Sequence, residues 1–259
     1  MTTLSKIIDK FCPDTPYSTP PDWRQGRTAY GGFSAALSLQ SALKQTPFTL
    51  PPLRTAQFAF LGPVADDITF RTQVIRQGKS ATSIAVDCHT AGQVALRSTL
   101  FFAQDRSSAI CHDLTVKPIV NEPGFYDSPC DAPYLPSFFT NFDVRFASNV
   151  VPVSGSPNPE LIAWVKLKDA RDIDPQLVLL AIGDCLPPAA MACFSTAAPI
   201  SSMNWAIDFV HMPKSTHGWF LLRSRSVFAS HGYSHQQMEA WDEDGQLLMI
   251  GTQTVAIFA

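Results

Sequence analysis

The segment Ala91-Gly92-Gln93-Val94, followed by Ser98-Thr99, has a counterpart in Asp244-Gly245-Gln246-Leu247, followed by Gly251-Thr252. The two segments are 153 residues apart, and the earlier Pro63 and Pro213 are 150 residues apart. Each segment comes late in a run that begins helix-like and continues as several strand-like stretches. The sequence therefore predicts one supersecondary unit present twice, at residues 31–102 and 175–258, with the sheets of the two copies side by side.

The first copy begins with a stretch from Phe33 to Lys44 whose apolar residues recur at helical spacing on nearly every side. A helix that is apolar almost all round is a central, buried one. The stretches that follow are rich in β-branched and aromatic residues, and hairpin signals such as Gln77-Gly78-Lys79 separate them. The expected fold class is α+β, with a long buried helix laid across an antiparallel sheet in each copy. The expected strands are 53–63, 68–76, 80–89 and 93–102, then 200–213, 219–228, 233–241 and 246–258.

We expect the chain to divide into an N-terminal unit at 1–105, a linker at 106–159 and a C-terminal unit at 160–259. Prolines interrupt every periodic run of the linker. Its aromatic residues, among them Phe138 and Phe139, indicate that part of it packs against the body of the protein. A strand at 161–167 is expected to open the second copy. Its counterpart before Gly31 is not evident, and the Ala29-Tyr30 region and the linker are the candidates.

The composition indicates a well-cored protein, since 46% of its 259 residues are hydrophobic and 16% are charged. A net charge of -3 without a basic run excludes a nucleic-acid partner. No apolar run approaches eighteen residues and the N-terminus lacks an apolar signal core, so we expect a cytoplasmic protein with no membrane span. The cysteines show no paired C-x-x-C spacing and are expected to be reduced thiols: Cys12, Cys88, Cys111, Cys130, Cys185 and Cys193. No metal-ligand spacing and no phosphate loop is present, so no cofactor is expected.

Two polar residues stand in otherwise apolar stretches of the second copy. Asp184 lies within residues 179–188, where a lone buried carboxylate is unfavourable unless it is paired. It could instead cap a helix that begins near Pro187-Pro188. In the register of the repeat, Gln253 matches the apolar Leu100, and a buried amide without partners costs roughly 1–3 kcal/mol. Gln253 therefore either makes a structural hydrogen bond or orients a water or a substrate carbonyl. Because only the second copy has these polar residues, the duplicated scaffold would hold one active site.

Ser202 opens the strand expected from residue 200 onward. Strict alternation places Met203, Trp205, Ile207 and Phe209 on one face, and Ser202, Asn204, Ala206 and Asp208 on the other. The polar face could simply be in contact with water. The sequence leaves open whether Ser201 or Ser202 is the hydroxyl that takes part in a site.

The tandem helix-and-sheet units resemble the double hotdog fold of acyl-CoA thioesterase II and its thioesterase-like relatives. The glycine pair that precedes the first helix of that family is similar to the one in Gly26-Arg27-Thr28-Ala29-Tyr30-Gly31-Gly32-Phe33-Ser34-Ala35-Ala36. In that family an Asp, a Thr or Ser, and a Gln of the second half hold the attacking water. The resemblance implies that these are Asp184, Ser202 and Gln253, and that the substrate is acyl-CoA or another acyl thioester. This chain departs from the family in having Ser rather than the commoner Thr, and Asn204 where relatives often carry Asp.

Thioester hydrolysis requires an oriented water and donors aimed at the developing oxyanion. Asp184 would be the general base, and a helix N-terminus, either the one at Gly31-Gly32 or one near Asp184, would supply backbone N–H groups to the oxyanion. The expected substrate-binding residues are Tyr30, Gly31, Gly32, Phe58, Phe60, Met203 and Trp205. The alternatives are a hotdog-type hydratase or dehydratase that uses a histidine such as His211, a non-catalytic acyl-binding protein, and a hydrolase of another thioester such as a polyketide intermediate. Free sheet edges make a homo-oligomer an open alternative to a monomer.

Overall fold

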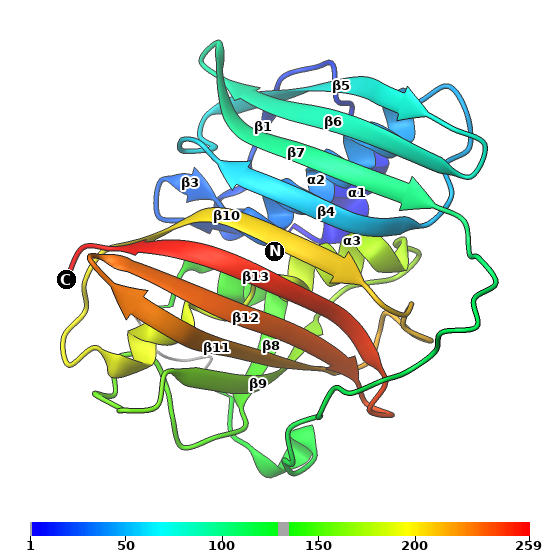
Figure 1. Cartoon of the computed structure of the whole chain (residues 1–259). Coiled ribbons are helices and arrows are strands. Elements are labelled where there is room, and N and C mark those ends of the chain that lie inside the picture. The colour runs from blue at the N-terminus through cyan, green and yellow to red at the C-terminus, as the bar shows by residue number, and fades with distance from the viewer. Residues whose placement is uncertain (1, 129–134) are drawn as a thin grey trace.

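The computed structural model describes residues 2–128 and 135–259, and all of it is shown in Figure 1. Among these residues the first half has two α-helices and five strands of the main sheet. They are α1 (Leu4–Lys10), β1 (Tyr17–Ser18), α2 (Gly31–Gln45), β4 (Leu53–Phe60), β5 (Asp67–Gln77), β6 (Ala81–Thr90) and β7 (Gln93–Ala103), with the small hairpin β2 (Arg24–Gln25) and β3 (Thr28–Ala29) before α2. The second half has β8 (Phe142–Phe146), β9 (Glu160–Leu167), α3 (Pro175–Gly183), β10 (Ile200–Phe209), β11 (Phe220–Ser230), β12 (Tyr233–Asp242) and β13 (Leu247–Ile257).

The main strands form one eleven-stranded sheet in the order β1-β5-β6-β7-β4-β10-β13-β12-β11-β9-β8. The order of the second half mirrors that of the first, and β4 and β10 join the halves as an antiparallel pair. The helices α2 and α3 lie together on one face of this sheet (Figure 1). The predicted α+β architecture, two helix-and-sheet copies with their sheets side by side, is confirmed.

Two bulges show that the repeat extends beyond the motif that revealed it. The pairing of β5 with β6 shifts register between Val74 and Arg76, and the pairing of β11 with β12 shifts between Ser226 and Phe228. The extra residues, Ile75 and Val227, are 56% and 52% exposed. The extra residues lie in β5 and in β11, which occupy corresponding places in the two copies. The copies therefore share these irregularities as well as their strand order.

The strand that the sequence did not locate before Gly31 is β1. It pairs with β5 at the edge of the first half, as β9 pairs with β11 in the second. The strand β1 lies between Pro16 and Pro20 and has only two residues, so it is too short to give a periodic signal. Within the expected linker, β8 pairs with β9 and extends the second half's sheet. The segment from Gln104 to Asn121 has no helix or strand and passes outside the sheet (Figure 1).

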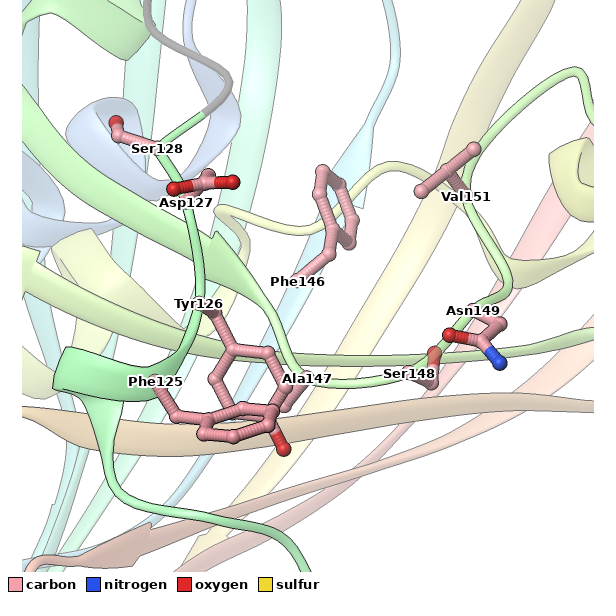
Figure 2. A pocket seen from close by; sticks show the side chains of 9 residues that line it. All are labelled: Phe125, Tyr126, Asp127, Ser128, Phe146, Ala147, Ser148, Asn149 and Val151. Atoms are coloured by element: carbon pink, nitrogen blue, oxygen red, sulfur yellow. The ribbon is translucent and has the colours of Figure 1, made fainter.

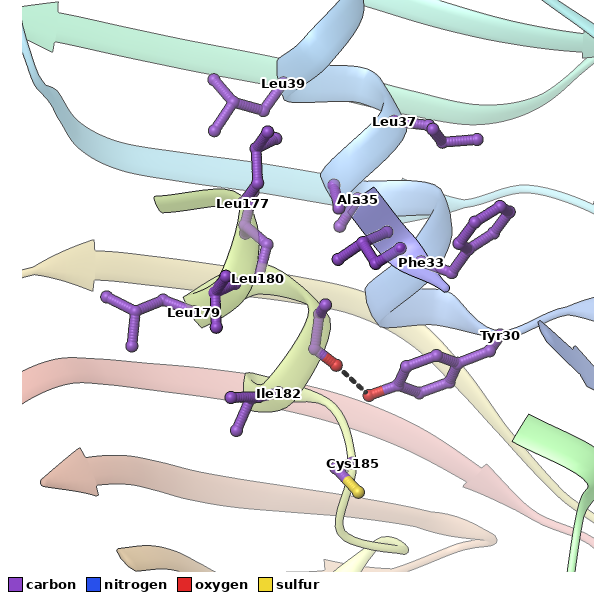
Figure 3. Packing of buried hydrophobic residues seen from close by; sticks show 14 of the residues in the cluster. Tyr30, Phe33, Ala35, Leu37, Leu39, Leu177, Leu179, Leu180, Ile182 and Cys185 are labelled. Carbon is purple, nitrogen blue, oxygen red and sulfur yellow. Dashed lines mark hydrogen bonds between the residues drawn. The ribbon is translucent and has the colours of Figure 1, made fainter. Parts of the chain in front are cut away.

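Close contact between α2 and α3 ties the two halves together. A β-carbon at Gly32 would lie 2.8 Å from the Leu180 carbonyl oxygen, so only glycine permits this approach. Tyr30, just before α2, donates its hydroxyl to the Ala181 carbonyl of α3 at 2.8 Å, as Figure 3 shows. Its ring stacks on Phe138 with 4.0 Å between centroids. Most buried hydrophobic residues of both halves consequently belong to one continuous core, and a smaller cluster around Trp164 and Trp241 lies in the second half.

No helix in the described part of the chain has the length and apolar character needed to cross a membrane. The cysteines Cys12, Cys88, Cys111, Cys185 and Cys193 are free thiols, and Cys130 lies outside the described residues.

Candidate active site

Asp184 follows the last residue of α3 and turns its carboxylate toward the first turn of α2 in the other half. Its Oδ1 accepts a hydrogen bond from Gln253 Nε2 at 3.1 Å, and the backbone N–H of Gly32 also bonds to the carboxylate. The short helix after Pro187-Pro188 begins at Ala189 and has no side-chain cap from its N-cap residue, Pro188. The expectation that Asp184 caps this following helix is therefore wrong. Asp184 instead satisfies a free N–H of α2, where the helix dipole favours negative charge.

Burial raises the pKa of Asp184 from 3.8 to about 7, although the bonds from Gln253 and Gly32 oppose this shift. Two neighbouring acids face it. Burial, and then the charge on Asp184, raise the pKa values of Tyr30 and Cys185 well above their ordinary values. Tyr30 and Cys185 thus stay protonated near neutral pH, and Asp184 is the group that exchanges a proton in this range.

Gln253 lies on β13 and is 3% exposed, yet both ends of its amide have partners. Its Nε2 donates to Asp184, and its Oε1 accepts from Gln236 Nε2 at 2.6 Å. Gln236 on β12 in turn accepts the backbone N–H of Ala189 at 2.9 Å. The sequence predicted a structural hydrogen bond as one of two roles for Gln253, and such a bond is present. The acceptor of the bond from Nε2 is the carboxylate of Asp184.

A bulge at Met203 decides which face of β10 carries the hydroxyl. Ser202 pairs with Val255 and Trp205 pairs with Gln253, so one residue too many lies between the two pairs. Ser202 consequently shares the inner face with Trp205 and Gln253, while Met203 is 45% exposed. Strict alternation had placed Met203 inside with Trp205, and the bulge overturns that expectation. Asn204 points outward and accepts the backbone N–H of Thr254 at 3.0 Å.

Asp184, Ser202 and Gln253 all line one cavity of about 1000 Å³, to which both halves contribute. Of the expected substrate-binding residues, Gly31 and Phe60 line it as well. The other lining residues are Gln25, Arg27, Thr28, Ala29, Ser34, Leu61, Gly62, Pro63, Val64, Leu135, Pro136, Phe138, Phe139, Phe146, Pro152, Val153, Cys185, Leu186, Pro187, Pro188, Met191, Ala197, Ile200 and Ser201. The sequence missed the aromatic wall at Phe138, Phe139 and Phe146, although the aromatic content of the expected linker had indicated packing.

The remaining substrate-binding candidates lie outside the lining. Tyr30 and Gly32 join the helices, as described above. Phe58 and Trp205 are buried against each other, with 5.6 Å between ring centroids. Met203 faces away from the cavity. At position 31, in contrast, the site leaves room only for glycine, because a β-carbon there would overlap Asp184 Oδ2 and lie 3.3 Å from the Phe60 ring.

A second pocket, of about 640 Å³, shares Phe146 with the cavity, and Figure 2 shows the residues that line it. Its walls include Phe125, Tyr126, Ala147 and Val151. All six histidines belong to the described part of the chain, and none of them lines the pocket or the cavity. His211 Nδ1 bonds to the Leu247 carbonyl at 2.8 Å. Among the described residues no group of three His, Cys, Asp or Glu side chains could hold a metal ion.

Solved structures with the same overall fold come from several bacteria. A protein of unknown function with a hot dog fold from Alicyclobacillus acidocaldarius is 22% identical, with a TM-score of 0.85 over 94% of this chain and 92% of the other. A tesB protein of Mycobacterium avium subspecies paratuberculosis is 12% identical, with a TM-score of 0.76 over 93% and 91%. An acyl-CoA thioesterase II of Mycobacterium marinum is 17% identical, with a TM-score of 0.68 over 94% and 95%. No curated protein sequence matches the chain.

Family models match both halves in the order expected for a duplicated protein. The model of the acyl-CoA thioesterase N-terminal domain matches residues 19–103, and that of the C-terminal domain matches residues 115–257. Together with the mirrored sheet and its two helices, these matches establish the double hotdog fold. The chain belongs to the acyl-CoA thioesterase family.

Proposed function

We propose that this protein hydrolyses acyl-CoA, or a closely related acyl thioester, by attack of a water that Asp184, Ser202 and Gln253 hold. The family supports acyl thioester hydrolysis in general. The observation that carries the specific proposal is the Asp184 carboxylate, which ionises near neutral pH and lines the cavity beside an amide and a hydroxyl. A general base is most effective when its pKa lies near the working pH.

In this mechanism the ionised Asp184 takes a proton from the water as its oxygen attacks the carbonyl carbon of the thioester. Gln253 keeps one N–H of its Nε2 on Asp184 and has a second for the water, and Ser202 bonds the water from β10. The first turn of α2, which reaches the cavity at Gly31, stabilises the oxyanion of the tetrahedral intermediate. The C–S bond then breaks, and the thiolate receives the proton that Asp184 took.

The walls of the cavity suit such a substrate. Phe60, Leu61, Phe138 and Leu186 give an apolar surface for an acyl chain. Besides Asp184, the one charged side chain among the lining residues that the structure describes is the exposed Arg27, whose guanidinium matches the geometry of a phosphate group. A coenzyme A ester has both chemistries, so we favour it over a thioester without a phosphate.

The two other classes of function fit the cavity less well. A hydratase or dehydratase would need an acid-base histidine, and no histidine lines the cavity. An acyl-binding protein without activity would need only the apolar walls. It would gain nothing from a carboxylate whose enclosure disfavours its charged form. Hydrolysis accounts for Asp184, the amide and the hydroxyl together.

The test is thiol release from a panel of acyl-CoA esters of graded chain length, with the matched variant Asp184→Asn. The variant keeps the size of the side chain and removes the base, so we expect turnover to fall by about 10²- to 10⁴-fold. Its melting temperature should stay at or above that of the wild type. Absence of thiol release from every ester by the wild-type protein would contradict the proposal, as would an Asp184→Asn variant with full activity.

A further inference from the structure

Gln236 does not line the cavity, yet it is the polar side chain that contacts Gln253 from behind. It lies directly opposite Gln253 in the pairing of β12 with β13, and the two side chains are 2% and 3% exposed. Two carboxamides buried side by side are unfavourable unless both are fully bonded. Here they form a line of three hydrogen bonds, from the Ala189 backbone through Gln236 and Gln253 to Asp184.

One end of this line has a fixed direction. The backbone N–H of Ala189 can only donate, so the Gln236 atom that it meets at 2.9 Å has to be the oxygen Oε1. The nitrogen of Gln236 then faces Gln253, whose nearer atom has to be its own oxygen. The nitrogen of Gln253 is thereby directed at Asp184. Each amide orientation follows from the one before it, beginning at a group that cannot be reversed.

The donor at the start of the line is free for a structural reason. Ala189 opens the short helix Ala189–Cys193, and its N-cap residue, Pro188, makes no side-chain cap. The first N–H of that helix consequently lacks an intrahelical partner. Gln236 supplies the missing acceptor from the sheet. The turn at Pro187-Pro188 thus places a backbone donor against the back of the site.

We propose that Gln236 is a positioning residue, which holds the Gln253 amide with its nitrogen toward Asp184 and so keeps that carboxylate ready to act as a base. The role rests on the proposed hydrolysis, but the orientation of the amides does not. With the nitrogen facing Asp184, the ionised carboxylate receives a hydrogen bond. With the amide reversed, two oxygens would face each other, an arrangement that only the protonated acid tolerates.

Two substitutions remove the donor in different ways. Gln236→Glu keeps the shape of the side chain, but as a carboxylate it can only accept, so Gln253 has to turn its nitrogen toward residue 236. Gln236→Met removes the donor without adding charge and leaves the Gln253 amide free to reverse. The matched control is Gln237→Glu, one residue along the same strand, where the exposed side chain accepts a bond from Arg225 on the outer face.

The readout is the acid limb of kcat/KM against pH, which reports the pKa of the base in the free enzyme. We expect both Gln236 variants to move this limb upward by about one pH unit. Turnover at pH 7 would fall about fivefold while KM stays constant, and the rate would recover at higher pH. The control should keep the wild-type limb. The other groups that face Asp184 are Tyr30 and Cys185, which remain protonated in this range.

Folded Gln236→Glu and Gln236→Met variants that both retain the wild-type acid limb would overturn the proposal. Neutron diffraction from the unmodified protein gives a reading that needs no variant, because it shows which Gln253 atom carries deuterium toward Asp184. An oxygen there would also overturn it. If the wild-type protein hydrolyses no thioester, the proposed function fails. Infrared titration of the Asp184 carboxyl in wild type and variants then still tests the effect of Gln236.

Discussion

The enclosure of Asp184 in the protein is what brings its ionisation up to near neutral pH. Its pKa of about 7 reflects burial, partly offset by the donors Gln253 and Gly32. The sequence indicated both Asp184 and Gln253, because each is a polar residue in an apolar stretch. It did not indicate Gln236, because Gln236 and Gln237 are adjacent on a strand and either could face water. Only the observed register shows that Gln236 is the one inside.

The raised pKa of Asp184 predicts a dependence of stability on pH. In the unfolded chain the carboxyl releases its proton near pH 4, but the folded protein keeps it up to about pH 7. The contribution of Asp184 to the free energy of unfolding is therefore most favourable below about pH 4, falls as the pH rises to about 7, and is constant above that. Urea unfolding of wild type and Asp184→Asn at several pH values measures it. The difference between the two proteins should grow in favour of the variant from pH 4 to pH 7, and a difference independent of pH would contradict the assigned pKa.

Irregularities of the strands decide which side chains of β10 face the cavity. The periodic patterns located the long helix and the described strands of eight or more residues, because each repeats its signal over several residues, but they missed the shorter β1, β2, β3 and β8. A bulge has no such signal, since it depends on how two strands pair. The one at Met203 turns Ser202 to the inner face and Met203 to the outer. For the same reason the two-residue strand β1 escaped detection.

The bulge at Met203 gives a prediction that separates the observed pairing from strict alternation. Met203→Lys should change the free energy of unfolding by no more than about 0.5 kcal/mol, because the side chain lies on the outer face of β10. Trp205→Ala, on the inner face of the same strand, should destabilise by about 3–5 kcal/mol. Denaturant unfolding of both variants makes the comparison. A destabilisation of Met203→Lys as large as that of Trp205→Ala would show that Met203 faces inward.

At the scale of the whole molecule, the duplication makes a scaffold of which one half supplies the acid, the amide and the hydroxyl. The first half contributes Gly31, Phe60 and the N-terminus of α2 to the same cavity. The repeat in the sequence predicted this arrangement, because similar closing segments stand at a constant offset. The cavity walls from Leu135 to Phe146 had no counterpart in the repeat, so the sequence could not place them.

The contacts between the two halves predict how the protein unfolds. A continuous core, the antiparallel pair of β4 and β10, and the Tyr30 to Ala181 hydrogen bond all cross it. We therefore expect one cooperative transition in denaturant, with far-ultraviolet circular dichroism and tryptophan fluorescence giving the same midpoint. Separate midpoints for the two signals, or a plateau between two transitions, would show that the halves are stable independently.

We propose that Asp184 activates a water that attacks the thioester directly. A single turnover in water enriched in ¹⁸O, with enzyme in excess over an acyl-CoA ester, tests it most directly. If water attacks the carbonyl, every molecule of the released acid carries one ¹⁸O atom from the first turnover, and mass spectrometry finds no acyl group on Asp184 or Ser202. Product that carries only ¹⁶O in the first turnover, or a trapped acyl-enzyme at either residue, would contradict the account.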